Sequence, residues 1–162
     1  TQIRIEVMAT LSTKITESVV LNGKERGSEI TLDVGSVTEV MHRILTCPAN
    51  QDTTVANFHA ATNTSDNSLD VENVKYIRLT NLDETNPINL SLQIDSAEDD
   101  SAAAESATIL VAAGRSFIMG VPSDGIAVSD ANATIVTTLH NLESILVDPG
   151  SNAISVEVFI AS

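Results

Sequence analysis

The sequence predicts an all-β fold, a β-sandwich or jelly roll of roughly eight to eleven short, mostly antiparallel strands. Three observations indicate this class. Segments with strand-type alternation recur about every 8–12 residues, turn residues separate them, and no segment carries a strong helical pattern. We expect residues 1–162 to form a single β-sandwich domain, because a chain of this length can bury about 70% of the surface that it exposes when unfolded.

The clearest local pattern lies in residues 74–94. Apolar and polar side chains alternate over its second half, where Ile88, Leu90, Leu92 and Ile94 are separated by Asn89, Ser91 and Gln93. This period of two predicts a half-buried strand. Residues 74–82 are rich in β-branched side chains and predict a more fully buried strand, while residues 83–87 have the length and composition of a hairpin loop. We therefore predict a hairpin in which Leu90 and Leu92 point into the core.

The N-terminal part also shows strand patterns. They occur in residues 2–8, in residues 15–21 and around Ile30, Leu32 and Val34. Asn22 and Gly23 favour positive φ and predict a two-residue turn, and residues 24–27 are expected to extend it into a solvated loop. Gly35 and Ser36 are expected to interrupt the third pattern. Residues 37–47 then predict a long strand, with a short helix over residues 38–44 as the alternative.

The segments on either side of the predicted hairpin are more polar. Residues 49–73 are interpreted as a long loop with one weak strand over residues 55–60. Residues 95–100 form an acidic run that is expected to face solvent. Residues 102–107 have helix propensity, enough for about one turn.

The C-terminal part predicts further short strands. They lie at residues 108–112, 115–120, 126–128, 133–137 and 154–160. Turns are expected at Ala113 and Gly114 and at residues 122–125. In residues 139–147 the leucine spacing also fits a helix, but residues 145–147 lead into an Asp-Pro-Gly turn, which favours a strand.

Composition narrows the range of partners. With 22 acidic and 8 basic residues the net charge is −14, so neither nucleic acid nor an anionic membrane is an expected partner. No run approaches the ~20 apolar residues that span a bilayer. Aromatic residues are scarce, which predicts an aliphatic core and provides no stacking platform for bases. The single Cys47 has no intramolecular disulfide partner and is expected to be a small buried residue.

No residue is assigned a catalytic, cofactor-binding or metal-binding role. His42, His59 and His140 are far apart in the sequence and lack the spacing of a zinc site on a helix. The acidic run 95–100 lacks the order of a calcium loop, so a cation there is the less favoured interpretation. The Ser116 segment lacks the flanking glycines of a nucleophile elbow. We therefore expect a protein that is not an enzyme and that requires no cofactor.

Two segments carry a family resemblance. Residues 75–92, KYIRLTNLDETNPINLSL, and residues 110–122, LVAAGRSFIMGVP, resemble small structural proteins of tailed bacteriophage virions. Several such proteins are capsid decoration, or cement, proteins with β-sandwich folds. The resemblance rests on a pair of strands and a turn followed by a strand, and no catalytic residue is carried over with it.

The resemblance implies a structural virion protein that binds the outside of a bacteriophage head and stabilises it. Its partner would be the major capsid protein or another virion protein. It further implies a homo-oligomer, with a trimer favoured, that is located on the capsid exterior after assembly in the host cytoplasm. The alternatives are a tail or baseplate component and a host-surface or glycan-binding β-sandwich module. On the capsid, the acidic run is expected to face solvent while apolar loops and the N-terminal strand approach the shell.

Overall fold

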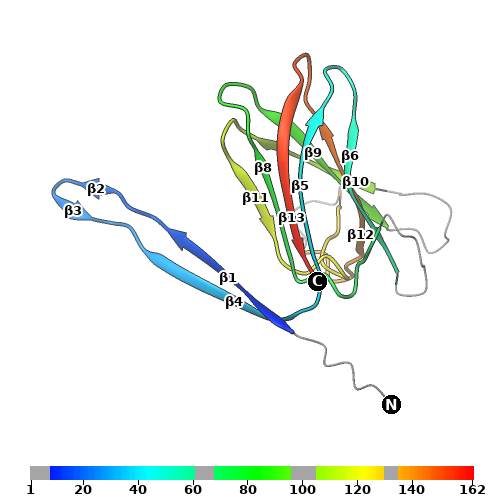
Figure 1. The fold of residues 1–162 in the computed structure, drawn as a ribbon, viewed down its shortest axis with the longest axis horizontal. Coiled ribbons are helices and arrows are strands. Elements are labelled where there is room, and N and C mark those ends of the chain that lie inside the picture. The colour runs from blue at the N-terminus through cyan, green and yellow to red at the C-terminus, as the bar shows by residue number, and fades with distance from the viewer. Residues whose placement is uncertain (1–7, 61–67, 96–104, 130–134) are drawn as a thin grey trace. The chain divides into compact units, whose positions relative to one another are not determined.

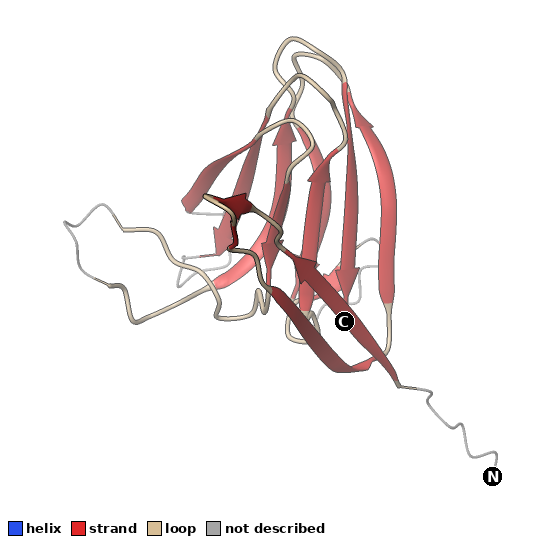
Figure 2. Cartoon of the chain, turned by 90° about the vertical axis from the view of Figure 1, so that its left-hand side faces the viewer, coloured by secondary structure: helices blue, strands red, loops and turns tan. Residues whose placement is uncertain are grey.

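The computed structural model of the chain describes residues 8–60, 68–95, 105–129 and 135–162. Within these ranges every regular element is a strand and no helix is present, as Figure 2 shows, so the predicted all-β class is confirmed. The chain divides into two compact units, Thr1–Glu39 and Val40–Ser162. That residues 1–162 form a single domain stays a prediction.

The described part of the first unit is a two-stranded ribbon, a name used here for residues 9–37. Strand β1 (Ala9–Thr16) pairs antiparallel with β4 (Glu29–Val37), and the two-residue strands β2 (Val20–Leu21) and β3 (Lys24–Glu25) continue the pairing (Figure 1). Asn22 and Gly23 have φ of 53° and 72°, which is the predicted two-residue turn.

Three details of the ribbon differ from the sequence predictions. The strand predicted over residues 15–21 is divided between β1, which ends at Thr16, and β2. Lys24 and Glu25 form β3, not the start of a solvated loop. Gly35 and Ser36 do not interrupt the strand but lie inside β4, where Ser36 has a φ of 57° and the register against β1 shifts near Leu11. A bulge of this kind absorbs one extra residue without ending the strand.

The second unit contains two sheets. One has the order β10-β9-β12-β6-β7 and the other the order β11-β8-β13-β5. The strands of the first sheet are β6 (Thr53–His59), β7 (Leu69–Asp70), β9 (Ile88–Asp95), β10 (Glu105–Val111) and β12 (Asn141–Asp148). The strands of the second are β5 (Val40–Cys47), β8 (Tyr76–Asn81), β11 (Ser116–Met119) and β13 (Ile154–Ala161).

The strand order is that of a jelly roll. When the short β7 is left out and the other strands of this unit are numbered in chain order, the sheets read 1-8-3-6 and 2-7-4-5. Apart from the short parallel pair β6 and β7, neighbouring strands are antiparallel. The chain thus crosses repeatedly between the sheets, and strands that follow each other in sequence usually lie in different sheets.

The predicted hairpin of residues 74–94 is wrong for this reason. Strand β8 pairs with β11 and β13, whereas β9 pairs with β10 and β12. The loop of residues 82–87 therefore joins two strands that face each other across the core. The predicted inward side is nevertheless confirmed, because Leu90 and Leu92 are buried. A hairpin and an arch between sheets show the same alternation of apolar residues, so local sequence does not distinguish them.

Several other predictions need correction. The strand predicted over residues 55–60 is confirmed as β6, but it is not a weak strand in a loop, because it packs Val55 and Phe58 into the core, and the short strand β7 follows it. Residues 105–107 do not continue a helical turn but begin β10. Residues 126–128 and 135–137 form no strand, and only Ile126 makes an isolated bridge to His140.

The remaining alternatives are resolved in favour of strands. Both β5 and β12 are strands where a helix was the alternative. Residues 2–7 of the predicted strand 2–8, the side chains of the acidic run 95–100 and the positions 102–104, 133 and 134 lie outside the described residues, while Met8 is described and is not part of a strand.

The core lies between the two sheets and is largely aliphatic. Buried residues come from both sides, and among the least exposed are Ile77, Leu79, Leu90, Ile145, Val147, Val156 and Val158. Cys47 is buried in the same cluster as a free thiol, as predicted. Because side chains of every long strand of this unit contribute, the two sheets stabilise each other.

Candidate interaction surface

The ribbon has two chemically different faces. Its register pairs Leu11 with Val34, Thr13 with Leu32 and Ile15 with Ile30. Directly opposed residues of an antiparallel pair point to the same side. These six residues form what we call the apolar face. The opposite, polar face carries Ser12, Lys14, Thr16, Glu29, Thr31 and Asp33, with Lys14 Nζ 2.9 Å from Glu29 Oε2.

Large side chains of the apolar face are exposed. Ile15, Ile30 and Leu32 are 44, 60 and 51% exposed. The same alternation in β9 is buried, because β9 has a facing sheet and the ribbon has two strands only. A two-stranded sheet is marginally stable in water, and a contiguous exposed apolar surface usually marks a binding site. The apolar face is therefore a candidate interaction surface.

The tip of the ribbon, residues 17–28, exposes apolar side chains beside the charged Glu17, Lys24, Glu25 and Arg26, and it is held in shape by hydrogen bonds. Val20 and Leu21 are 68 and 59% exposed. Glu25 Oε1 accepts hydrogen bonds from the backbone N–H groups of Gly27 (2.7 Å) and Val19 (3.0 Å), which lower the pKa of its carboxyl. Glu17 and Ser28 close the base of the tip through a backbone bond of 2.7 Å. The tip thus presents apolar side chains on a preorganised backbone.

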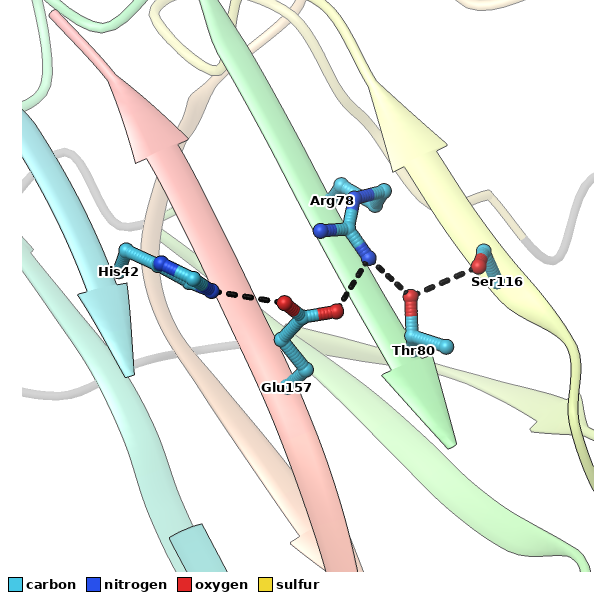
Figure 3. A network of polar contacts seen from close by, with 5 residues as sticks. All are labelled: His42, Arg78, Thr80, Ser116 and Glu157. Atoms are coloured by element: carbon cyan, nitrogen blue, oxygen red, sulfur yellow. Dashed lines mark hydrogen bonds and ion pairs between the residues drawn. The ribbon is translucent and has the colours of Figure 1, made fainter. Parts of the chain in front are cut away.

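The outer side of the β11-β8-β13-β5 sheet carries a continuous row of polar side chains. Figure 3 shows His42, Glu157, Arg78, Thr80 and Ser116 in this row, with one strand after another contributing. Glu157 Oε1 lies 2.7 Å from His42 Nε2, and Glu157 Oε2 accepts a bond of 2.8 Å from Arg78. Arg78 also donates to Thr80, whose Oγ1 lies 2.8 Å from Ser116 Oγ.

This polar row is a stabilising cross-strand network. The hydrogen bond from Arg78, followed by that from His42, lowers the pKa of the Glu157 carboxyl. Each carboxylate oxygen has a partner, and the Ser116 hydroxyl faces another hydroxyl, not a base that would activate it. The network links all four strands across their outer side.

The three histidines occupy separate places. His42 belongs to the polar row, His59 Nδ1 lies 2.6 Å from Ser68 Oγ, and the backbone of His140 bridges Ile126. In the described ranges, no group of three or more His, Cys, Asp or Glu side chains could hold a metal ion. Burial raises the pKa of the Cys47 thiol, which makes it a poor nucleophile.

One open pocket lies between loops of the second unit. It has a volume of about 360 Å³, and the residues that line it are Asn86, Pro87, Asn89, Leu110, Asp148, Pro149, Gly150, Ser151 and Asn152. Asn152 donates to the side-chain oxygen of Asn86 over 3.3 Å, which connects the β8–β9 and β12–β13 loops. Sequence reasoning did not find this pocket, because only the exchange of strands between sheets brings these loops together.

These features define the class of the protein as a jelly roll whose chain also contains an amphipathic two-stranded ribbon. No family model and no curated protein matches the sequence. A solved structure described as "Bacillus endospore appendages form a novel family of disulfide-linked pili" is similar at a TM-score of 0.36 and 12% identity. The similarity covers 75% of this chain and 84% of that chain. In the described part of the chain, no helix is long and apolar enough to cross a membrane.

Proposed function

We propose that this chain is a structural virion protein, a decoration protein that binds the major capsid protein on the outside of a bacteriophage head and stabilises it. The observation that carries the proposal is the pair of exposed apolar side chains, Val20 and Leu21, on the preorganised tip of the ribbon. Apolar side chains on an ordered backbone lose little conformational freedom on docking, which favours a long-lived contact.

The charge distribution is compatible with this function. A net charge of −14 disfavours contact with the packaged genome, because phosphate binding depends on basic side chains. Adhesion to a protein shell requires apolar burial, and the tip supplies it. Association through the tip is expected to survive moderately high salt, since screening weakens exposed ion pairs but leaves apolar contact largely intact.

The test is co-sedimentation with undecorated heads at low and high salt. Replacing Val20 and Leu21 together by Ser should weaken binding at least tenfold, because two exposed apolar side chains would no longer be buried. The control replaces Thr16 and Thr31 of the polar face by Ser, which changes neither charge nor the tip, and it should bind like the parent. Equal binding of the tip variant, or release of the parent at modest salt, would contradict the proposal.

The same assay with purified tails separates the two virion locations. Binding to tails and not to heads would favour a tail or baseplate component. If the chain binds neither particle, the assigned function fails.

A host-surface or glycan-binding module is the second candidate, and the pocket at Asn86, Asn89 and Asp148 favours it. Amide and carboxylate groups beside prolines can hydrogen-bond sugar hydroxyls. Binding to a glycan array that is lost on Asn89→Ala, together with no binding to virion particles, would select this candidate.

A further inference from the structure

We propose that the apolar face of the ribbon packs against the same face of a second copy of this chain. The contact would be face to face and two-fold symmetric, and it would form a small four-stranded sandwich from two ribbons. This inference goes beyond capsid decoration, because it concerns association of the chain with itself, and it uses the face of the ribbon instead of its tip.

The first argument is the need for a covering layer. Each ribbon has a single sheet of two strands, and Ile15, Ile30 and Leu32 are exposed on one side of it. A second ribbon has the same length, the same width and the same apolar side chains. Stacked sheets lie about 10 Å apart, a spacing that Ile, Leu and Val side chains from two inner faces fill well.

The second argument is charge. Residues 1–39 hold four of the eight basic residues and six of the 22 acidic ones, a net charge of −2, which leaves −12 on residues 40–162. Two copies therefore repel each other most strongly through their jelly rolls. The apolar face contains no charged side chain, because Lys14, Glu29 and Asp33 lie on the opposite face. The ribbon is thus where two copies can approach at the lowest electrostatic cost.

The third argument is area. Two apolar faces bring together ten aliphatic side chains, five from each copy: Leu11, Ile15, Ile30, Leu32 and Val34. Burying an aliphatic side chain removes on the order of 60–120 Å² from water, so the contact would bury on the order of 1,000 Å². Stable protein interfaces bury about 1,200–2,000 Å², so this contact would belong to the weaker class just below that range. We therefore expect a dimer that dissociates on dilution.

Sedimentation velocity over a wide concentration range tests the inference. The parent should shift from monomer to dimer as concentration rises. Replacing Ile30 and Leu32 together by Ser should raise the dissociation constant at least tenfold, while the Thr16 and Thr31 to Ser control should leave it unchanged. A parent that stays monomeric at every concentration overturns the inference. That outcome includes the case in which another part of the same chain covers the apolar face. A trimer also overturns it, because face-to-face pairing joins two copies.

Cysteine cross-linking tests the geometry in chains that keep their apolar residues. Thr13→Cys places a thiol on the apolar face, and Thr31→Cys places one on the polar face. The native Cys47 is buried, so the parent chain, which has this cysteine alone, gives the background rate of cross-linking. Under mild oxidation Thr13→Cys should give covalent dimers much faster than Thr31→Cys, and equal rates would overturn the inference. Binding of the Ile30 and Leu32 variant to heads is measured separately, in the co-sedimentation assay. Failure of dimerisation and failure of capsid decoration are therefore distinguishable.

Discussion

The side-chain amide of Asn81, at the end of β8, donates a hydrogen bond of 3.2 Å to the carbonyl oxygen of Val111, at the end of β10. These strands belong to opposite sheets, so the bond ties the two layers together. The same amide donates to the carbonyl of Asn86, and its oxygen accepts from the backbone N–H of Asp83. Asn81 is fully buried, and both ends of its side chain are satisfied.

Asn81→Ala should therefore destabilise the jelly roll by about 3 kcal/mol, because it removes three hydrogen bonds and leaves backbone groups unpaired in a buried place. Chemical denaturation followed by circular dichroism measures the loss. Asn89→Ala, at an exposed position on the outer side of β9, is the matched control and should change stability by less than about 0.5 kcal/mol. Equal effects would show that the Asn81 bridge contributes nothing.

Leu90→Asp should unfold the jelly roll or destabilise it by about 4 kcal/mol or more, since it buries an unpaired carboxylate between the sheets. Ser91→Asp, one residue further on the outer side of β9, should be tolerated. Thermal unfolding of both variants checks the register of β9. Similar melting temperatures for the two would contradict the assigned inward face.

Stability should depend on the ionisation of Glu157. Arg78 first and then His42 lower the pKa of its carboxyl, so folding favours the ionised form. The contribution is complete above the ordinary value of 4.5 and is lost as pH falls through the lower folded value. Glu157→Gln should cost about 1 kcal/mol at neutral pH. Below the folded pKa of Glu157, the free energies of unfolding of the variant and the parent should become equal. Urea unfolding at neutral pH and at a pH below that pKa measures both values, and a difference that stays constant between them would contradict the prediction.

Gly27→Ala should disrupt the tip of the ribbon. A Cβ at Gly27 would lie 1.8 Å from the backbone oxygen of Glu17, a clash that the chain must relieve by moving the backbone. Gly35→Ala is the control, because a Cβ there meets nothing within 4 Å. Amide hydrogen exchange should show faster exchange around Val19 in Gly27→Ala only, with β9 and β13 unchanged in both variants. Unaltered protection in Gly27→Ala would contradict the described tip.

The alternation of Ile88, Leu90, Leu92 and Ile94 was enough to predict a strand and its buried side, because successive side chains of any strand point to opposite faces. Asn22 and Gly23 were enough to predict the turn, since few residues adopt positive φ readily. The strand at residues 154–160 and the burial of Cys47 followed from equally local patterns.

The choice of partner strand was decided only by the tertiary structure. Every strand offers the same N–H and C=O groups along its edges, so the loop at residues 83–87 suits a hairpin as well as the arch that Asn81 holds in place. The same holds for the ribbon, whose Ile30 and Leu32 alternate just as core residues do but are exposed. The sequence by itself determined which residues are strand-like and which side of each strand is apolar. Whether that side is buried depends on a facing layer, which only the tertiary structure decides, because the layer comes from segments distant in the chain or from another molecule.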